Sequence, residues 1–128
     1  MTQIKATLRY LHIAPRKVRL VAQVVRGMQA KRALNELAGL SKRASLPLQK
    51  LLESGIANAE HNFALKEQDL YVSELRVNGA PMQKRTFPRS RGRADIKRKR
   101  MSHITLVLTD QRLTTDDLRQ SFVVSRKS

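Results

Sequence analysis

Residues 70–79 read LYVSELRVNG, and their apolar and polar side chains alternate as in a half-buried β-strand. Residues 101–109, MSHITLVLT, alternate in the same way. If the two strands pair antiparallel, their apolar sides match only where opposed residue numbers sum to an odd number, here about 179–183, because a slip of one residue turns every apolar side chain to solvent. This register predicts a common buried face made of Tyr71, Leu75, Val77, Ile104, Leu106 and Leu108.

The same register centres the connecting turn between Arg89 and Gly92, inside the run KRTFPRSRGRADIKRKR at residues 84–100. That run holds nine Lys or Arg against one acid, Asp95, so it cannot form a packed core. We therefore expect residues 80–100, called the arm below, to form the far end of a hairpin that is anchored in the sheet. About ten residues separate the sheet from the turn, which at about 3.3 Å per residue gives a reach of roughly 30 Å.

Three segments between residues 15 and 61 show the helical spacing of apolar side chains. The first is expected between Pro15, which suits a first turn, and Gly27, which suits a helix end. The second covers about 30–38, and the third begins at Ser41 or Ser45, of which Ser45 is the better N-cap. The expected apolar positions are Val18, Leu20, Val21, Val24, Val25 and Met28, then Ala30, Ala33, Leu34, Leu37 and Ala38, then Leu48, Leu51, Leu52, Ile56 and Ala59.

A further strand is expected near the N-terminus and a polar tail at the C-terminus. In residues 4–10 the side chains of Ile4, Ala6, Leu8 and Tyr10 share one face. A length of 128 residues suits a single domain, which we expect over 1–110. The polar tail is expected over 111–128, with a short helix at TDDLRQSF.

The net charge of +16 on so small a chain favours a polyanionic partner. Nucleic acid is the first candidate, because neutralised phosphates release condensed counterions. An anionic membrane surface is the rival, although it calls for a basic amphipathic helix with a broad apolar face. In the first expected helix Arg16, Arg19 and Arg26 fall along one stripe with Lys17 beside it, and we interpret this stripe as a phosphate contact.

Chemistry-bearing motifs are scarce. The chain has no cysteine, and His12, His61 and His103 are too scattered to make a metal site. We expect no catalytic residue, no metal and no cofactor. An alternative hypothesis makes the chain a nucleic-acid-processing enzyme that uses Glu60, His61 and Asp69, and another makes it an architectural DNA binder. The opening MTQIKATLRY lacks the pattern of a secretory signal, so a cytoplasmic location without membrane attachment is expected.

Three blocks in the same order resemble the bacterial large-subunit ribosomal protein family L22: PRKVRLVAQVVRG at 15–27, SGIANAEHN at 54–62 and PRSRGRADIKRKRMSHITLVLTD at 88–110. The resemblance implies an α+β fold, with three helices packed on a small three-stranded antiparallel sheet and a long protruding β-hairpin. It also implies a structural, non-enzymatic constituent of the large subunit that binds large-subunit rRNA and supports its assembly. The implied partners are this rRNA, neighbouring ribosomal proteins and the nascent polypeptide, with no homo-oligomer.

The resemblance further implies that the hairpin lines the nascent-peptide exit tunnel of the cytoplasmic ribosome, beside the site where macrolides lodge. The segment expected at the tunnel wall comprises Met82, Gln83, Lys84, Arg85, Pro88, Arg89, Ser90, Arg91, Gly92 and Arg93. The residues expected to bind rRNA are Arg9, Arg16, Lys17, Arg19, Arg26, Lys84, Arg85, Arg89, Arg91, Arg93, Lys97, Arg98, Lys99 and Arg100.

Overall fold

The computed structural model describes residues 2–110 of the chain, so the expectations for the tail at 111–128 lie outside the described residues. The elements are β1 (Gln3–Leu11), α1 (Pro15–Val25), α2 (Ala30–Gly39), α3 (Ser45–Phe63), the 3-10 turn η1 (Glu67–Asp69), β2 (Tyr71–Pro88), the 3-10 turn η2 (Ser90–Gly92) and β3 (Ala94–Thr109).

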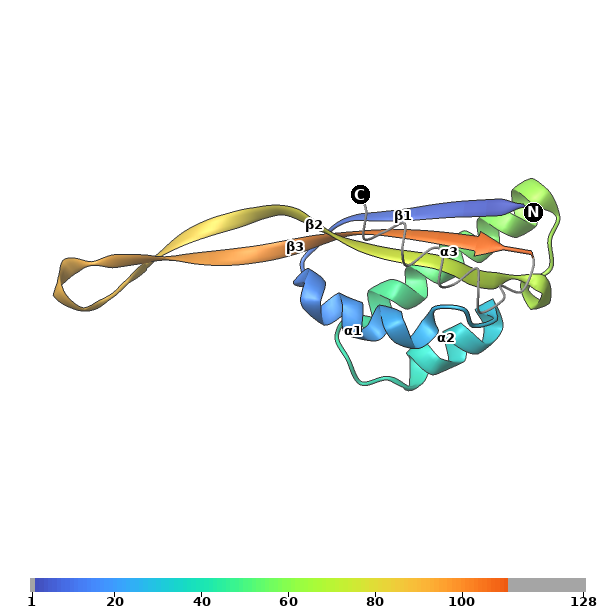
Figure 1. Cartoon of the computed structure of the whole chain (residues 1–128), viewed down its shortest axis with the longest axis horizontal. Helices are drawn as coiled ribbons and strands as arrows, with labels where there is room; N and C mark the ends of the chain where they lie inside the picture. The colour runs from blue at the N-terminus through green and yellow to red at the C-terminus, as the bar shows by residue number, and fades with distance from the viewer. Residues whose placement is uncertain (1, 111–128) are drawn as a thin grey trace.

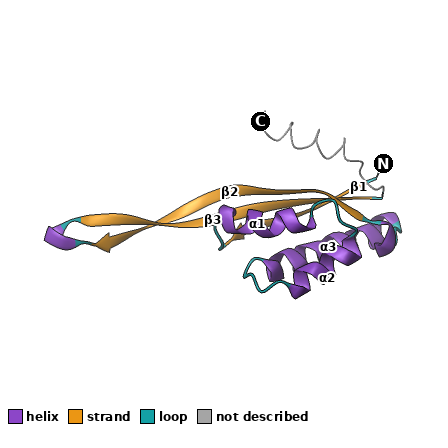
Figure 2. Cartoon of the chain, turned by 60° about the horizontal axis from the view of Figure 1, so that its bottom comes forward, coloured by secondary structure: helices purple, strands orange, loops and turns teal. Residues whose placement is uncertain are grey.

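The three strands form one antiparallel sheet in the order β1–β3–β2. All three helices cover the same face of this sheet, as Figures 1 and 2 show from two directions. Residues 2–79 and 101–110 are called the body below. Beyond the body, β2 and β3 continue together as a two-stranded ribbon (Figure 1). The expected fold class is confirmed: α+β, with three helices on a three-stranded antiparallel sheet and a long hairpin.

Strand β1 buries its apolar face only over its first half. Ile4 and Ala6 are buried and Leu8 is half-buried, as the alternation predicts. Tyr10, which was expected on the same face, is 55% exposed. The reason is a bulge between Leu8 and Leu11, where β1 carries one residue more than β3 and Tyr10 takes a φ of 55°.

Strands β2 and β3 pair in the predicted register, with opposed residue numbers that sum to 181 from Glu74 to Ala80. Ser73 is a bulge that shifts the register by one residue at the start of β2. The bulge changes which residues face the helices, so Val72 is fully buried whereas Tyr71, predicted to point inward, is only half-buried. The other predicted inward residues are buried: Leu75, Val77, Ile104, Leu106 and Leu108.

Helix α1 lies where the sequence predicts, between Pro15 and Gly27, whose φ is 78°. Its buried stripe includes Ala22, whereas Leu20 and Val24 are 63% and 39% exposed. The spacing explains this correction, because residues 18, 21, 22 and 25 share one side of a helix and residues 20 and 24 fall outside it. In α2, Ala30, Ala33 and Leu37 are buried, Leu34 is half-buried and Ala38 is exposed.

Helix α3 begins at Ser45, which is its first helical residue and not its N-cap as expected. The N-cap position belongs to Ala44, which offers no capping side chain. The Ser45 hydroxyl instead donates to the carbonyl of Lys42 at 2.6 Å and to that of Leu40 at 3.2 Å, so it ties the preceding loop to the helix. The predicted apolar positions are all buried: Leu48, Leu51, Leu52, Ile56 and Ala59.

Gly55 lets α3 approach the sheet closely. A Cβ at this position would lie 3.1 Å from Cδ2 of Leu106 and 3.1 Å from Cδ1 of Leu108. Both leucines are buried inward residues of β3. The absence of a side chain at Gly55 therefore sets the distance between the longest helix and the central strand.

Backbone hydrogen bonds from the α1–α2 connection close the outer edge of β2 near its start. The amide of Gly27 donates to the carbonyl of Val72 at 2.9 Å, and the amide of Val72 donates to the carbonyl of Met28 at 2.9 Å. The amide of Ala30 donates to the carbonyl of Leu70 at 2.8 Å. This part of the edge therefore offers no free template for a further strand.

Candidate nucleic-acid interface

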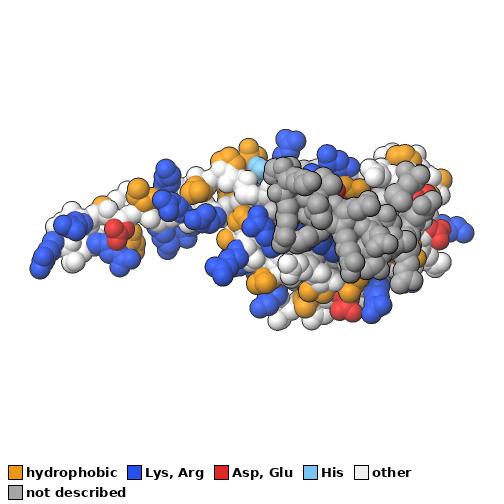
Figure 3. Space-filling model, in the orientation of Figure 1, with side chains coloured by type: hydrophobic (Ala, Val, Ile, Leu, Met, Phe, Trp, Pro, Cys, Tyr) orange, Lys and Arg blue, Asp and Glu red, His pale blue; other side chains and the backbone are white. Residues whose placement is uncertain are grey.

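The arm leaves the body as a two-stranded ribbon, and no helix of the described residues covers it (Figure 1). Every residue from Pro81 to Arg100 is exposed, and Lys and Arg side chains occur along its whole length (Figure 3). Its two strands stay paired out to Pro88 and Ala94, after a bulge that follows Ala80. A two-stranded ribbon without an apolar face is marginally stable by itself. The arm therefore contributes little to the folding of the free chain.

The tip of the arm reverses the chain at residues 89–93, where the register placed the turn. Arg91 and Gly92 both have left-handed backbone angles, with φ of 61° and 70°. The amide of Arg89 donates to the carbonyl of Arg93 at 2.7 Å, which closes the turn. All five residues of the tip are exposed, and three of them are arginines.

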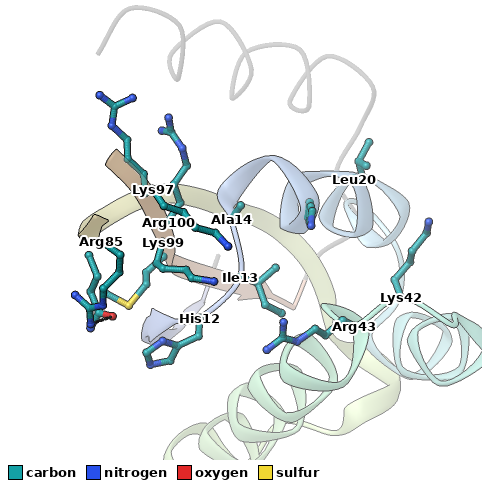
Figure 4. A pocket seen from close by; sticks show the side chains of 14 residues that line it. His12, Ile13, Ala14, Leu20, Lys42, Arg43, Arg85, Lys97, Lys99 and Arg100 are labelled. Atoms are coloured by element: carbon teal, nitrogen blue, oxygen red, sulfur yellow. Dashed lines mark hydrogen bonds between the residues drawn. The ribbon is translucent and has the colours of Figure 1, made fainter. Parts of the chain in front are cut away.

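At the base of the arm lies a cleft of about 810 Å³, called the basic cleft below. It is bordered by the arm, by the loop between β1 and α1 with the start of α1, and by the loop between α2 and α3 (Figure 4). Among the described residues its lining includes eight Lys or Arg residues and no carboxylate. The lining residues are His12, Ile13, Ala14, Lys17, Leu20, Lys42, Arg43, Gln83, Arg85, Lys97, Arg98, Lys99, Arg100 and Met101.

Two buried hydroxyl groups hold the loops that border the basic cleft. Ser102, fully buried in β3, donates from Oγ to the carbonyl of Ile13 at 2.6 Å and so fixes the loop before α1. Ser45 holds the other loop through the carbonyl of Lys42, as described above. Both bonds keep polar groups satisfied in the interior, where a lost partner is costly. The two loops that border the basic cleft are therefore held in place before any partner arrives.

Sequence reasoning missed Lys42 and Arg43, which lie across the basic cleft from Lys99 and Arg100 (Figure 4). The two residues stand in a short loop far from the arm in sequence, and no periodic pattern connects them with it. The only signal was a basic pair directly before an expected helix start. The role of this basic pair follows from the fold, which brings residues 42–43 and 97–100 to the same cleft.

Two of the predicted phosphate-binding residues on α1 make contacts within the protein instead of pointing freely outward. The Nε and Nη2 atoms of Arg19 donate to the carbonyl of Val77 at 3.2 and 3.1 Å. Those of Arg26 donate to the carbonyl of Leu75 at 3.0 and 2.6 Å. These bonds extend the closure of the β2 edge beyond Val72, so both arginines hold α1 against the sheet.

Burial lowers the pKa of Arg26 from its ordinary value, against a raising effect of Glu74 and with a smaller lowering effect of Arg19. A guanidinium titrates so far above neutral pH that Arg26 keeps its charge. Arg26 as a whole is exposed, while its hydrogen bonds to the carbonyl of Leu75 are partly buried. The basic stripe of the first helix thus contains residues of two kinds. Arg19 and Arg26 hold the fold together, and Lys17 lines the basic cleft.

The remaining predicted sites lie apart from the cleft. Arg9 and Arg16 are exposed, on β1 and at the start of α1, and neither lines the basic cleft. Arg89, Arg91 and Arg93 lie farther out on the arm, and Lys84 lies between Gln83 and Arg85 without lining the basic cleft itself.

The alternative catalytic residues do not form a site. Glu60 and His61 are exposed near the end of α3, and Asp69 is exposed in η1. Within residues 2–110 there is no group of three or more His, Asp or Glu side chains that could hold a metal ion. In the same part of the chain no helix is long and apolar enough to cross a membrane.

Comparison with known proteins agrees with the geometry. Residues 6–109 match the family described as ribosomal protein L22p/L17e. Curated relatives named large ribosomal subunit protein uL22 include one from Thermotoga sp. (strain RQ2), 48% identical over 93% of this chain and 74% of the relative. Another, from Caldicellulosiruptor saccharolyticus, is 48% identical over 86% of this chain and 93% of the relative.

A third relative of the same name, from Fusobacterium nucleatum subsp. nucleatum, is 46% identical over 85% of this chain and 98% of the relative. All three carry the name of a ribosomal protein and none that of an enzyme, in agreement with the non-enzymatic expectation. The matched region spans β1 from Ala6, the three helices and the whole arm. The resemblance found in the sequence is thus confirmed, and the chain belongs to the ribosomal protein L22p/L17e family of the large ribosomal subunit.

Proposed function

We propose that this chain binds large-subunit rRNA through the basic cleft and the arm, and thereby supports assembly of the subunit. The observation that carries the proposal is the basic cleft itself, in which three separate segments bring eight cations together without a carboxylate. The cationic side chains of such a surface repel one another, and a partner with closely spaced negative charges lowers this repulsion. The phosphates of folded RNA provide that charge density.

Binding gains its free energy mainly from the release of counterions that the phosphates had condensed. If about 6–10 phosphates are neutralised, the affinity falls by about three to five decades between 50 and 200 mM salt. The two serine-anchored loops add specificity, because their cations are already placed when RNA arrives. Recognition on this account reads the path of the RNA backbone more than the order of its bases.

The arm has a second role in the proposal. Its exposed strands pass between rRNA helices, and its tip at residues 89–93 reaches the wall of the nascent-peptide exit tunnel of the cytoplasmic ribosome. The segment from Met82 to Arg93 then meets the nascent polypeptide, and the body meets neighbouring ribosomal proteins. Support comes from the complete exposure of residues 81–100 together with membership of the family.

Salt-dependent binding of the full chain to large-subunit rRNA tests the proposal. Lys97→Gln with Lys99→Gln removes two cations from the basic cleft. Lys31→Gln with Lys50→Gln removes two exposed cations from α2 and α3 and is the matched control, since both variants lose the same charge.

We expect the cleft variant to flatten the slope of log affinity against log salt by about 1.4–1.8, and the control to leave it nearly unchanged. Equal slopes in the two variants would refute the basic cleft as the binding surface. Co-sedimentation of the chain with large subunits, and not with DNA, separates the proposal from an architectural DNA binder.

A further inference from the structure

The only aromatic residue of the arm is Phe87, at the penultimate position of β2. Its side chain is 48% exposed, so much of an apolar ring faces water. Asp95, the second residue of β3, pairs with Phe87 across the hairpin. Phe87 and Asp95 therefore lie on the same face of the ribbon.

Two contacts hold the surroundings of the ring. The guanidinium carbon of Arg89 lies over the Phe87 ring, 5.0 Å from its centroid, which is a cation–π contact. The Nε atom of Arg89 lies 3.0 Å from Oδ2 of Asp95, so an ion pair keeps the guanidinium in this place. Together these two contacts join Phe87, Arg89 and Asp95 into one cluster near the tip.

A hollow of about 280 Å³ adjoins this cluster and is lined by Phe87, Arg89, Asp95, Ile96 and Lys97. It differs from the basic cleft in its chemistry. Two of its five lining residues are apolar, Phe87 and the 61% exposed Ile96, and Asp95 is the only carboxylate of the arm. The lining carries two cations, of which Arg89 is paired with Asp95, so it attracts a phosphate less than the basic cleft does, whereas the flat face of a nucleobase would meet the ring of Phe87.

We propose that this hollow takes one unpaired nucleobase, which stacks on the ring of Phe87; the inference rests on the proposed binding of rRNA. Aromatic side chains provide such stacking platforms in single-stranded RNA sites, and any of the four bases can use them. The flanking cations Arg85 and Lys97 contact the backbone on either side of the base. The arm then holds RNA in two ways, by charge along its length and by stacking at Phe87.

The test uses large subunits purified with the variant chains and irradiated at short ultraviolet wavelength, which joins a stacked base to the aromatic residue that it contacts. Wild type should give one crosslinked nucleotide on the peptide that contains Phe87. Phe87→Trp should keep this crosslink, and Phe87→Leu should lose it. Thr86→Ala is the matched control, because the neighbouring residue of a strand points to the other face.

In a parallel measurement with purified large-subunit rRNA, Phe87→Leu should weaken binding by about 5- to 140-fold, the value of one lost stack. Thr86→Ala should change the affinity less than twofold. Crosslinks at other residues of the arm without one at Phe87, or equal affinity of Phe87→Leu and wild type, would overturn the stacking site alone. Absence of every variant and of wild type from the large subunit would overturn the proposed function instead.

Discussion

Replacing Arg26 by Gln should destabilise the body of the protein, here residues 2–79 and 101–110, although Arg26 belongs to a basic stripe that suggests RNA contact. Two donors of its guanidinium bind the carbonyl of Leu75, at 3.0 and 2.6 Å. Hydrogen bonds from charged donors contribute about 1.5–3 kcal/mol, and the partial exposure of this pair favours the lower end, about 1.5 kcal/mol. Urea unfolding of the free chain should therefore show a midpoint lowered by about 0.5–1.5 M.

Arg16→Gln is the matched control on the same helix. Arg16 is exposed, and no hydrogen bond or ion pair of its side chain occurs within the described part of the chain. Its substitution should change the free energy of unfolding by less than about 0.5 kcal/mol. Equal midpoints for Arg26→Gln and wild type would refute the reasoning, because the hydrogen bonds of Arg26 to Leu75 would then add nothing to the stability of the body.

Three further substitutions test other parts of the account. Gly55→Val should lower the free energy of unfolding by about 1–3 kcal/mol in urea titrations, because even a Cβ at this position would lie too close to two leucine side chains of β3. An unchanged midpoint would show that these leucines move aside without a cost in stability. Lys42→Gln with Arg43→Gln should reduce the salt slope of rRNA binding by about 1.4–1.8, and an unchanged slope would remove this loop from the interface. Arg91→Gln with Arg93→Gln should leave urea unfolding and incorporation into large subunits unchanged while altering macrolide sensitivity, and loss of the variant from subunits would contradict this.

Much of the fold could be predicted because its signals are local. The period of apolar residues fixed the pairing of β2 with β3 and the position of the turn, since a slip of one residue would expose the buried face. Tyr71 and Tyr10 were assigned to the interior wrongly, because bulges at Ser73 and before Leu11 shift the alternation. A bulge depends on which strand lies opposite, and a single strand's sequence does not carry that information.

The interface was predictable where charge is dense and missed where the fold assembles it. The run at 84–100 was evident from composition, but the contribution of Lys42 and Arg43 depends on how α2 and α3 place their connecting loop. The basic stripe on α1 was visible, yet Arg19 and Arg26 differ from Arg16 only in the carbonyls of β2 that they reach. Side-chain partners across elements, and not helix periodicity, decide these roles.

The most direct measurement of the central claim is amide hydrogen exchange of the full chain, free and bound to large-subunit rRNA. In the free chain the amides of residues 82–98 should exchange fast, because a two-stranded ribbon without a core is marginally stable. With rRNA bound, the arm and the loop before Ser45 should become protected, while the buried amides of α3 stay as they were. Protection of the arm already in the free chain, or an arm that still exchanges fast in the complex, would contradict the account.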